Sequence, residues 1–287
     1  MKIGFATYAE EPNGTGDDLL AAEPLRRRGI ETVPVVWNDP AAPLDGLAAI
    51  VIRSCWDYHL ETEAFLAWLD GLEARGVRVF NAPQLIRWNL DKRYLADLGD
   101  AGVAVPRTVF LAKGGAADLR RLLLERSFDE AVVKPVVSLG AYQTWRTSLE
   151  QAAAHQDDFA ALVAERDVMV QPLLRQVMSE GELSLLFFGG QFSHAVLKRP
   201  QAGDFRVQTH FGGSSGPVQA DPALVEQAAA VLAACPAPPL YARVDGVNQG
   251  GRLVLMELEA IDPFLFLGAD PAAPERFAAA VAAALGR

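Results

Sequence analysis

Residues 241–266, YARVDGVNQGGRLVLMELEAIDPFLF, contain two apolar segments on either side of a polar, glycine-rich one. The apolar segments, 241–247 and 252–260, have the length and composition of β-strands. The residues between them, 248–251, read Asn-Gln-Gly-Gly, and glycine accepts the positive φ that tight turns require. The sequence therefore predicts a β-hairpin.

This hairpin carries three acidic residues: Asp245 on its first strand, and Glu257 and Glu259 on its second. Side chains alternate across a strand, so both glutamates should lie on one face, with Met256 and Leu258 on the other. Three carboxylates on one face repel one another unless a cation lies between them. Mg²⁺ takes oxygen ligands and keeps positions open for water and phosphate, so we expect a magnesium site. The alternative is a solvated strand face.

The composition describes an acidic globular protein. The chain has 287 residues, 51% of them hydrophobic, which is enough for two or three subdomains with a large core. Its net charge is −10. A negative net charge argues against a nucleic-acid partner, whose phosphates require a basic surface. No segment has the length of a membrane span or the pattern of a signal peptide, so we expect a cytoplasmic location and no membrane partner.

Residues 1–105 predict a small α/β domain. Apolar segments at 2–8, 31–37, 48–58 and 77–83 alternate with helical patterns near 17–29 and 61–75. This alternation predicts a parallel, doubly wound sheet. Ligands of such sheets lie beyond the carboxyl ends of strands, which favours Arg53 and Asp57 as substrate contacts. The alternative is a structural ion pair between these two residues.

Two other kinds of active site are not expected. The first strand is not followed by the G-x-G-x-x-G pattern of a dinucleotide site, which disfavours an oxidoreductase. Cys55 has no recognisable base partner and is interpreted as a small residue at a strand end. His194 and His210 are interpreted as hydrogen-bonding residues rather than bases.

Two lysines occupy positions that suggest an anionic ligand. Lys92 begins a predicted helix over 89–102, and Lys134 ends the apolar strand EAVVKP, where an unpaired charge is costly to bury. The following loop, 136–145, contains Ser138, and its backbone N–H groups could cover phosphates. A plain surface turn is the alternative. After this loop we expect a helix over 148–165.

Further motifs follow in a fixed order. They are VQPLL at 170–174, GELS at 181–184, a hairpin ending at Lys198, DFR at 204–206, and a Gly-Gly pair at 212–213. Together with the two lysines and the acidic hairpin, this order resembles the ATP-grasp superfamily, in its glutathione synthetase and RimK-like branch. The resemblance implies an α/β fold with a Rossmann-like pre-ATP-grasp domain at 1–105. It also implies a small lobe with the phosphate loop at 106–175 and a large lobe with the metal site at 176–287.

The resemblance also implies roles for single residues. Those implied to contact ATP are Lys92, Lys134, Ser138, Gln171, Leu173, Glu182 and Lys198. Those implied to stabilise the reacting phosphate and the oxyanion are Lys198, Arg206, and the backbone near Gly212 and Gly213. Those implied to bind Mg²⁺, as two ions, are Asp245, Glu257 and Glu259.

The activity implied is ATP-dependent ligation of an amino-acid carboxylate to an amine through an acyl phosphate. Segments such as RSCWDY and FSHAVLKRP are similar to the cyclo-ligase group typified by the O-ureido-serine cyclo-ligase of cycloserine biosynthesis, which closes a ring within one amino acid. Glutathione synthetase-like or RimK-like peptide ligation remains open, as does a regulatory protein that binds Mg·ATP. The partner expected is a small amino-acid-like molecule, and homodimers are common among such relatives.

Overall fold

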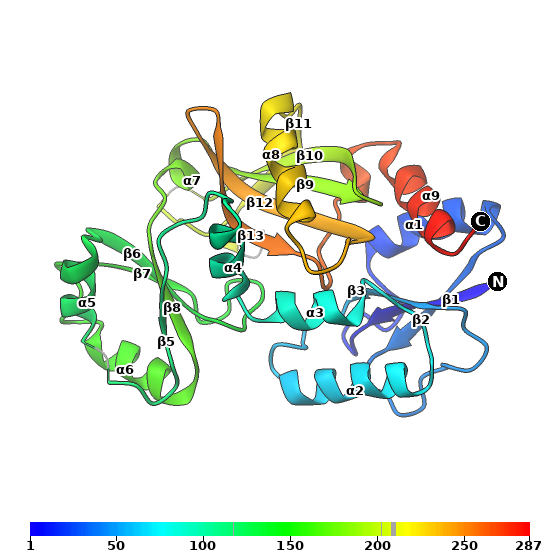
Figure 1. Ribbon diagram of the computed structural model, residues 1–287, viewed down its shortest axis with the longest axis horizontal. Coiled ribbons are helices and arrows are strands. Elements are labelled where there is room, and N and C mark those ends of the chain that lie inside the picture. Colours follow the sequence, from blue (N-terminus) through cyan, green and yellow to red (C-terminus); the bar gives the residue numbers. More distant parts are fainter. Residues whose placement is uncertain (117, 202, 208–210) are drawn as a thin grey trace.

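The computed structural model describes residues 1–116, 118–201, 203–207 and 211–287. These residues build three β-sheets, whose strand orders are β2-β1-β3-β4, β5-β8-β6-β7 and β11-β10-β9-β12-β13. The first sheet and the second lie at opposite ends of the long axis of the molecule (Figure 1). The three sheets follow one another along the chain in the order of the three predicted parts.

The first sheet is parallel throughout, as the sequence predicts. Its strands are β1 (Lys2–Thr7), β2 (Glu31–Val36), β3 (Ile50–Ser54) and β4 (Val79–Phe80). Alternate residues of its strands enter two different cores. Ile3 and Phe5 pack with α1 (Gly16–Arg27), whereas Ile50 and Ile52 pack with α2 (Thr62–Ala74) and α3 (Pro83–Leu90). Helices therefore cover both faces, which confirms the doubly wound arrangement (Figure 1).

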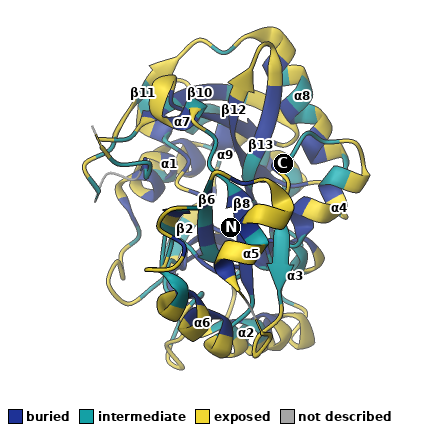
Figure 2. Ribbon diagram, turned by 90° about the vertical axis from the view of Figure 1, so that its left-hand side faces the viewer, coloured by how far each residue is buried: buried dark blue, intermediate teal, exposed yellow. Residues whose placement is uncertain are grey.

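The second sheet is antiparallel and comprises β5 (Val109–Leu111), β6 (Glu130–Pro135), β7 (Trp145–Ser148) and β8 (Val168–Pro172). Helices α5 (Leu119–Arg126) and α6 (Gln156–Glu165) pack against this sheet and share one hydrophobic core with it. Outward-facing turns of these helices are exposed, while strands β6 and β8 consist of buried and intermediate residues (Figure 2). The sheet holds Lys134 at the end of β6 and Gln171 in β8.

The third sheet contains the predicted hairpin, formed by β12 (Tyr241–Gln249) and β13 (Arg252–Glu259). Its other strands are β9 (Glu182–Phe188), β10 (Gln191–Arg199) and β11 (Ser214–Val218), and all pairings are antiparallel. The remaining helices are α4 (Tyr94–Asp100), α7 (Gln176–Ser179), α8 (Pro222–Ala233), the short 3-10 helix η2 (Leu267–Ala269) and α9 (Ala273–Ala284).

Strand β13 is the edge of this sheet, and its outward backbone groups are bonded by the segment that precedes the second sheet. Asn89 Nδ2 donates to the carbonyl of Leu258 at 2.8 Å, and Asn89 Oδ1 accepts from the amide of Ala260 at 2.8 Å. Tyr94 Oη accepts from the amide of Leu258 at 2.9 Å, and the amide of Leu255 donates to the carbonyl of Ala104 at 2.8 Å. Residues of the same chain thus form hydrogen bonds along the outer edge of β13.

Two predicted helices differ from those observed. The helix expected over 148–165 begins only at Gln156, because residues 145–148 pair with β6 as β7 and turns follow. The helix expected over 89–102 is divided into α3 and α4, since Asp91 takes an extended conformation with φ −100° and ψ 117°. This break places Lys92 between two helices.

One buried core joins the two ends of the chain. Leu25 of α1 and Phe5 of β1 pack in the same cluster as Phe277 of α9. Asp17, at the start of α1, accepts hydrogen bonds from the amides of Leu265 and Leu267 at 2.8 and 2.9 Å. The last residues of the chain are therefore anchored on the first sheet (Figure 1).

Candidate active site

A cavity of about 790 Å³ lies among the three sheets, a size typical of small-molecule sites. Ten of the residues singled out in the sequence line it, together with further aromatic and apolar side chains. The ten are Lys92, Lys134, Ser138, Gln171, Leu173, Glu182, Lys198, Arg206, Glu257 and Glu259. Residues that lie up to 167 positions apart in the sequence, from Lys92 to Glu259, thus face one space.

Asp245 lies deeper, beneath the wall of the cavity, and is 2% exposed. Its Oδ2 accepts from Lys198 Nζ at 3.1 Å and from Arg243 NH2 at 2.9 Å, and its Oδ1 accepts from Ser184 Oγ at 2.5 Å. Burial opposes ionisation, but Arg243 and Lys198 hold the pKa of Asp245 well below its ordinary value. The cations nearest this carboxylate are therefore side chains of the protein itself.

The two glutamates of β13 line the cavity with partners of their own. Glu257 Oε1 lies 3.2 Å from Lys92 Nζ, and the lysines 92 and 134 lower its pKa against the effect of burial. Glu259 forms an ion pair with Arg243. Burial, together with Asp245 and Glu257, nevertheless raises the pKa of Glu259 to about 7. The acidic face predicted for the hairpin is thus interleaved with lysine and arginine.

Met256 also lines the cavity, although the alternation of the strand predicts that it points away. The register of the hairpin shifts between Asp245 and Gly246, so that Asp245 faces Glu257 while Gly246 faces Leu255. Met256 is the extra residue of this β-bulge, and a bulge turns a side chain out of the regular alternation. The prediction for Met256 was therefore wrong.

Lys198 is buried and Lys134 is half-buried, and the two lysines have different partners. Burial lowers the pKa of Lys134, and Glu257 opposes this effect. Lys198 forms ion pairs with Asp245 and Glu182, and these two carboxylates raise its pKa although burial alone would lower it. Burial also raises the pKa of Glu182. These lysines belong to different sheets, Lys134 to β6 and Lys198 to β10.

The loop 136–145 covers one side of the cavity through Ser138, Gly140, Ala141 and Thr144. The carbonyl of Ser138 accepts a hydrogen bond from Lys92 Nζ at 2.5 Å. Ala141 has a φ of 62°, a left-handed conformation that is uncommon for residues other than glycine. The loop is therefore held in one conformation next to the first lysine.

Gln171 and Leu173 lie at the end of β8, where the strand leaves the second sheet. Gln171 Nε2 donates to Thr108 Oγ1 at 2.9 Å, and the amide of Leu173 donates to the carbonyl of Glu130 at 3.0 Å. These bonds fix the edge of the cavity.

Arg206 lines the cavity but its guanidinium is held by a neighbour. Its Nε and NH2 bond the carboxylate of Asp204 at 3.1 and 2.8 Å, and its Cζ lies 3.6 Å from the centroid of the Phe211 ring. Arg206 lowers the pKa of Asp204 to about 2. Gly212 and Gly213 are not among the described lining residues, whereas Ser215 is. His210 lies outside the described residues.

Arg53 and Asp57 lie away from the cavity wall, and both are engaged in structural bonds. Arg53 is 2% exposed, because all five residues of β3 are buried, and its Nε donates to Asp18 Oδ1 at 2.9 Å. Asp57 Oδ1 accepts from Trp37 Nε1 at 2.6 Å. The ion pair considered for these two residues is replaced by one between Arg53 and Asp18.

Several lining residues were not expected from the sequence. Arg243 bridges Asp245 and Glu259, and its position two residues before Asp245 on the same strand face could have indicated this. Asp262, Phe264 and Phe266 follow β13 directly and line the cavity as well. Their contribution depends on the path of an irregular segment, which periodicity does not predict.

Two of the three residues expected to bind Mg²⁺ are placed to do so. Glu257 and Glu259 place carboxylates on the cavity, and Mg²⁺ commonly takes one or two protein carboxylates and fills its other positions with water and phosphate oxygens. Asp245 is occupied by two cations and a hydroxyl. Within the described ranges, no group of three or more His, Cys, Asp or Glu side chains is arranged to hold a metal ion.

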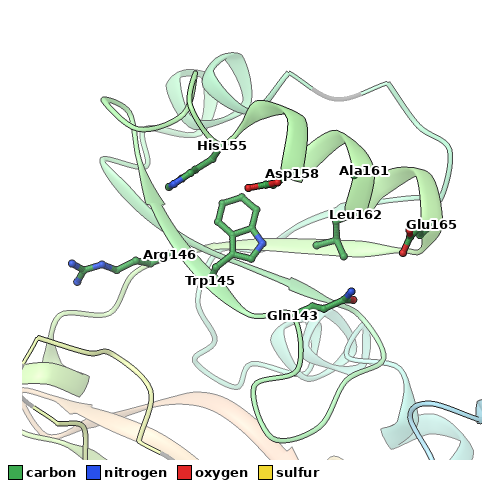
Figure 3. A pocket seen from close by; sticks show the side chains of 8 residues that line it. All are labelled: Gln143, Trp145, Arg146, His155, Asp158, Ala161, Leu162 and Glu165. Carbon is green, nitrogen blue, oxygen red and sulfur yellow. The ribbon is translucent and has the colours of Figure 1, made fainter. Parts of the chain in front are cut away.

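A second, more open hollow of about 400 Å³ lies on the outer side of β7 and α6. Its side chains, among them Trp145, His155 and Glu165, are spread along the helix and strand, and Arg146 points away from the others (Figure 3). None of the ten residues named above lines it. The larger cavity is therefore the candidate active site.

Comparison with known proteins agrees with this architecture. A solved RimK-domain ATP-grasp protein from Sphaerobacter thermophilus superimposes with a TM-score of 0.69 and 20% identity, covering 98% of this chain and 99% of that one. The three sheets with a cavity among them thus form the ATP-grasp fold, as predicted. The part of the chain that the structure describes contains no helix long and apolar enough to cross a membrane.

More specific matches concern a single family. A model of the N-terminal domain of D-cycloserine synthetase DcsG matches residues 3–81. The crystal structure of D-cycloserine synthetase DcsG superimposes with a TM-score of 0.88 at 30% identity, covering 99% of this chain and 100% of that one. The cycloserine biosynthesis protein DcsG of Streptomyces lavendulae is 34% identical over 278 residues, 91% of each chain. The chain belongs to the DcsG family of ATP-grasp ligases and is an enzyme that forms carbon–nitrogen bonds.

Proposed function

We propose that this ligase uses Mg·ATP to activate the carboxylate of an amino acid and closes a ring within that molecule, with O-ureido-serine as the model substrate. The observation that carries the proposal is the cavity that brings Lys92, Lys134 and Lys198 together with Glu257 and Glu259. Family membership supports ring closure, because the relatives are named for cycloserine formation.

The charges of the cavity favour a metal-bound nucleotide. Its described lining residues include five cations, Lys92, Lys134, Lys198, Arg206 and Arg243, and four carboxylates, Glu182, Glu257, Glu259 and Asp262. Their formal charges nearly cancel, so they do not by themselves neutralise a triphosphate. Mg²⁺ bound by Glu257 and Glu259 supplies the missing positive charge and polarises the phosphate oxygens. A second ion, with Asp245 as a ligand, belongs to the same proposal and requires Asp245 to exchange a cationic partner.

In the proposed reaction a carboxylate oxygen of the substrate attacks the γ-phosphorus of ATP, and ADP leaves. A nitrogen of the substrate then attacks the acyl carbon, loses its proton, and expels phosphate. Lys134, Lys198 and Arg206 stabilise the charge that moves through these steps. Gln171 and Leu173 hold the base, Glu182 the ribose, and the loop with Ser138 excludes water. The backbone near Gly212 and Gly213 is proposed to meet the oxyanion.

We further propose that the chain is organised in three consecutive parts. The domain ranges 1–105, 106–175 and 176–287 each contain one of the three sheets, although α4 packs with the third sheet and α9 with the first. A cytoplasmic enzyme that acts as a homodimer is compatible with this architecture. Arg53 and Asp57 would act on the substrate only through the segments they support.

The first test is ADP release with Mg·ATP and O-ureido-serine, with the ring product identified by mass spectrometry. We expect substrate-dependent ADP release without an added amine, and a decrease of at least about 100-fold in Glu257→Gln, since this variant removes a metal ligand. Glu125→Gln, which changes an exposed acid on α5, is the matched control and should keep the activity. ADP release that requires a second amine would instead favour peptide ligation, and ATP binding without any turnover would favour a regulatory protein.

A further inference from the structure

Asp262 presents a buried carboxylate that the protein leaves incompletely bonded. The residue lines the cavity and is 3% exposed. Its Oδ2 has no hydrogen-bond partner among the described residues, and none of the ion pairs formed by these residues includes Asp262. Buried polar groups are almost always bonded, and a buried charge without a partner is costly. A group bound in the cavity could supply the missing donor.

The backbone around Asp262 is fixed from the first sheet. Trp56 Nε1 donates to the carbonyl of Asp262 at 3.1 Å, and Arg53 NH2 donates to the carbonyl of Pro263 at 3.4 Å. Arg53 forms its ion pair with Asp18. Burial raises the pKa of Asp262, and the charge of Arg53 opposes this effect without overcoming it. The carboxylate is thus positioned by neighbours that form no ion pair with it, as expected for a preorganised binding group.

Aromatic side chains surround this part of the cavity. The rings of Trp56 and Phe264 are 6.4 Å apart between centroids, and those of Phe264 and Phe266 are 4.9 Å apart. All three residues line the cavity. The faces of aromatic rings attract organic cations, and tryptophan does so most strongly. A carboxylate next to such rings favours an ammonium group over an anion or a neutral hydroxyl.

The other acids that line the cavity already have cations. Glu257 pairs with Lys92, Glu259 with Arg243, and Glu182 with Lys198. Asp262 therefore differs from them in needing a positive charge from outside the described chain. Its location between the first sheet and the end of β13 separates it from Lys134 and Gln171 on the second sheet.

We propose that Asp262 binds the ammonium group of the amino-acid substrate, in a compartment walled by Trp56, Phe264 and Phe266. This inference rests on the proposed function and specifies its substrate class, an amino acid with a free amine near the carboxylate that is activated. The amine is held and does not react, so the contact orients the carboxylate toward the phosphate donor. Asp262 accepts the hydrogen bond and undergoes no covalent change.

The experiment compares matched ligands with and without the amine. Calorimetry in the presence of Mg²⁺ and a non-hydrolysable ATP analogue measures the Kd of O-ureido-serine and of 3-(ureidooxy)propanoate, which lacks only the amine. Serine and 3-hydroxypropanoate form a second pair. The wild-type protein should bind the amine-bearing member about tenfold or more tightly, the size expected for a charge-assisted hydrogen bond. Asp262→Asn and Asp262→Ser should lose this preference while binding the amine-free ligand within about twofold.

Asp45→Asn, which alters a fully exposed acid, is the matched control and should keep the preference. The proposal is overturned if the wild type binds neither member of either pair or binds both members equally. It is also overturned if the Asp262 variants keep the preference, or if they weaken both ligands alike. If one Asp262 variant does not fold, the other still tests the assignment, and equal wild-type affinities for the two members of each pair overturn it without any variant.

The same samples separate this proposal from the proposed function. Amine-dependent binding without ADP release or ring product contradicts ring closure and supports the ammonium contact. ADP release and ring product with unchanged affinities in Asp262→Asn contradict the ammonium contact alone.

Discussion

Arg243 shows how a single side chain organises the acidic face of the hairpin. Its guanidinium bonds Asp245, pairs with Glu259, and donates from NH1 to the carbonyl of Phe264 at 3.0 Å. Buried ion pairs gain little over apolar packing, but removal of one partner leaves an uncompensated buried charge. Removal of Arg243 should therefore destabilise the protein mainly by leaving Asp245 and Glu259 without their guanidinium partner.

We expect Arg243→Met to lower the free energy of unfolding by about 3–5 kcal/mol, since the buried Asp245 and the half-buried Glu259 lose their guanidinium partner. Urea denaturation measures this change. Arg252→Met alters an exposed arginine at the start of β13 and should change the free energy by no more than about 0.5 kcal/mol. Equal stability of the two variants would show that Lys198 alone compensates Asp245.

The residues of the cavity divide into those that the sequence could indicate and those that it could not. Lys134 and Glu257 were identifiable, because a charge in or at the end of an apolar strand implies a partner. The occupation of Asp245 by Lys198 and Arg243 depends on pairing between strands distant in sequence, and so was not foreseen. Asp262 lies in an irregular segment without any repeating pattern.

Among the elements, β10 supports the cavity through a hydrogen-bonded histidine. His194 is 6% exposed, and its Nε2 lies 3.1 Å from the carbonyl oxygens of both Leu265 and Phe266. Its Nδ1 lies 2.8 Å from Ser193 Oγ, which also accepts from Arg276 Nε at 2.8 Å. This chain of bonds connects β10 and α9 to the segment that carries the aromatic residues of the cavity.

Burial lowers the pKa of His194, so the unfolded state takes up a proton more readily than the folded one. The stability that neutral His194 contributes is present above the ordinary pKa of about 6.5 and is lost as pH falls through the lower pKa of the folded state. The difference in unfolding free energy between the wild type and His194→Gln should thus be larger at pH 7.5 than at pH 5.0. Urea titrations at both pH values test this, and a difference that grows toward low pH would contradict the assignment.

Strands with a strong pattern of apolar residues were predicted correctly, whereas strands with a weak pattern were not. The hairpin β12–β13 and the parallel strands have apolar runs bounded by turns, and both were predicted correctly. Strands β7 and β11, with the sequences WRTS and SSGPV, are short and largely polar, so their pairing with apolar neighbours determines them instead. Tertiary context commonly overrides local preference in this way.

For the whole molecule, the packing of α9 on the first sheet joins both ends of the chain. Phe277 lies in one cluster with Phe5 and Leu25, and its ring centroid is 6.4 Å from that of Phe5. No periodicity in the sequence indicates a contact between residues so far apart. The order of the three sheets, by contrast, was predictable from the order of the motifs along the chain.

Phe277→Ala should lower the free energy of unfolding by about 3–5 kcal/mol, because it opens a cavity in this shared core. Native-state hydrogen exchange should show that α1 and α9 lose protection together. Leu124→Ala, at an exposed position of α5, is the control and should have little effect. Loss of protection in α9 alone would show that the two ends unfold independently.

The hydrogen bonds that Asn89, Tyr94 and Ala104 form with β13 also affect whether another copy of the protein can add a strand to this edge. An unpaired edge strand is a template on which a strand of another molecule can add, and such addition leads to aggregation. Here the outward amides of Leu255 and Leu258 are already bonded within the chain. At the opposite edge, β11 contains Pro217, which has no amide hydrogen to donate. A continuous intermolecular sheet built on the third sheet is therefore disfavoured at both of its edges.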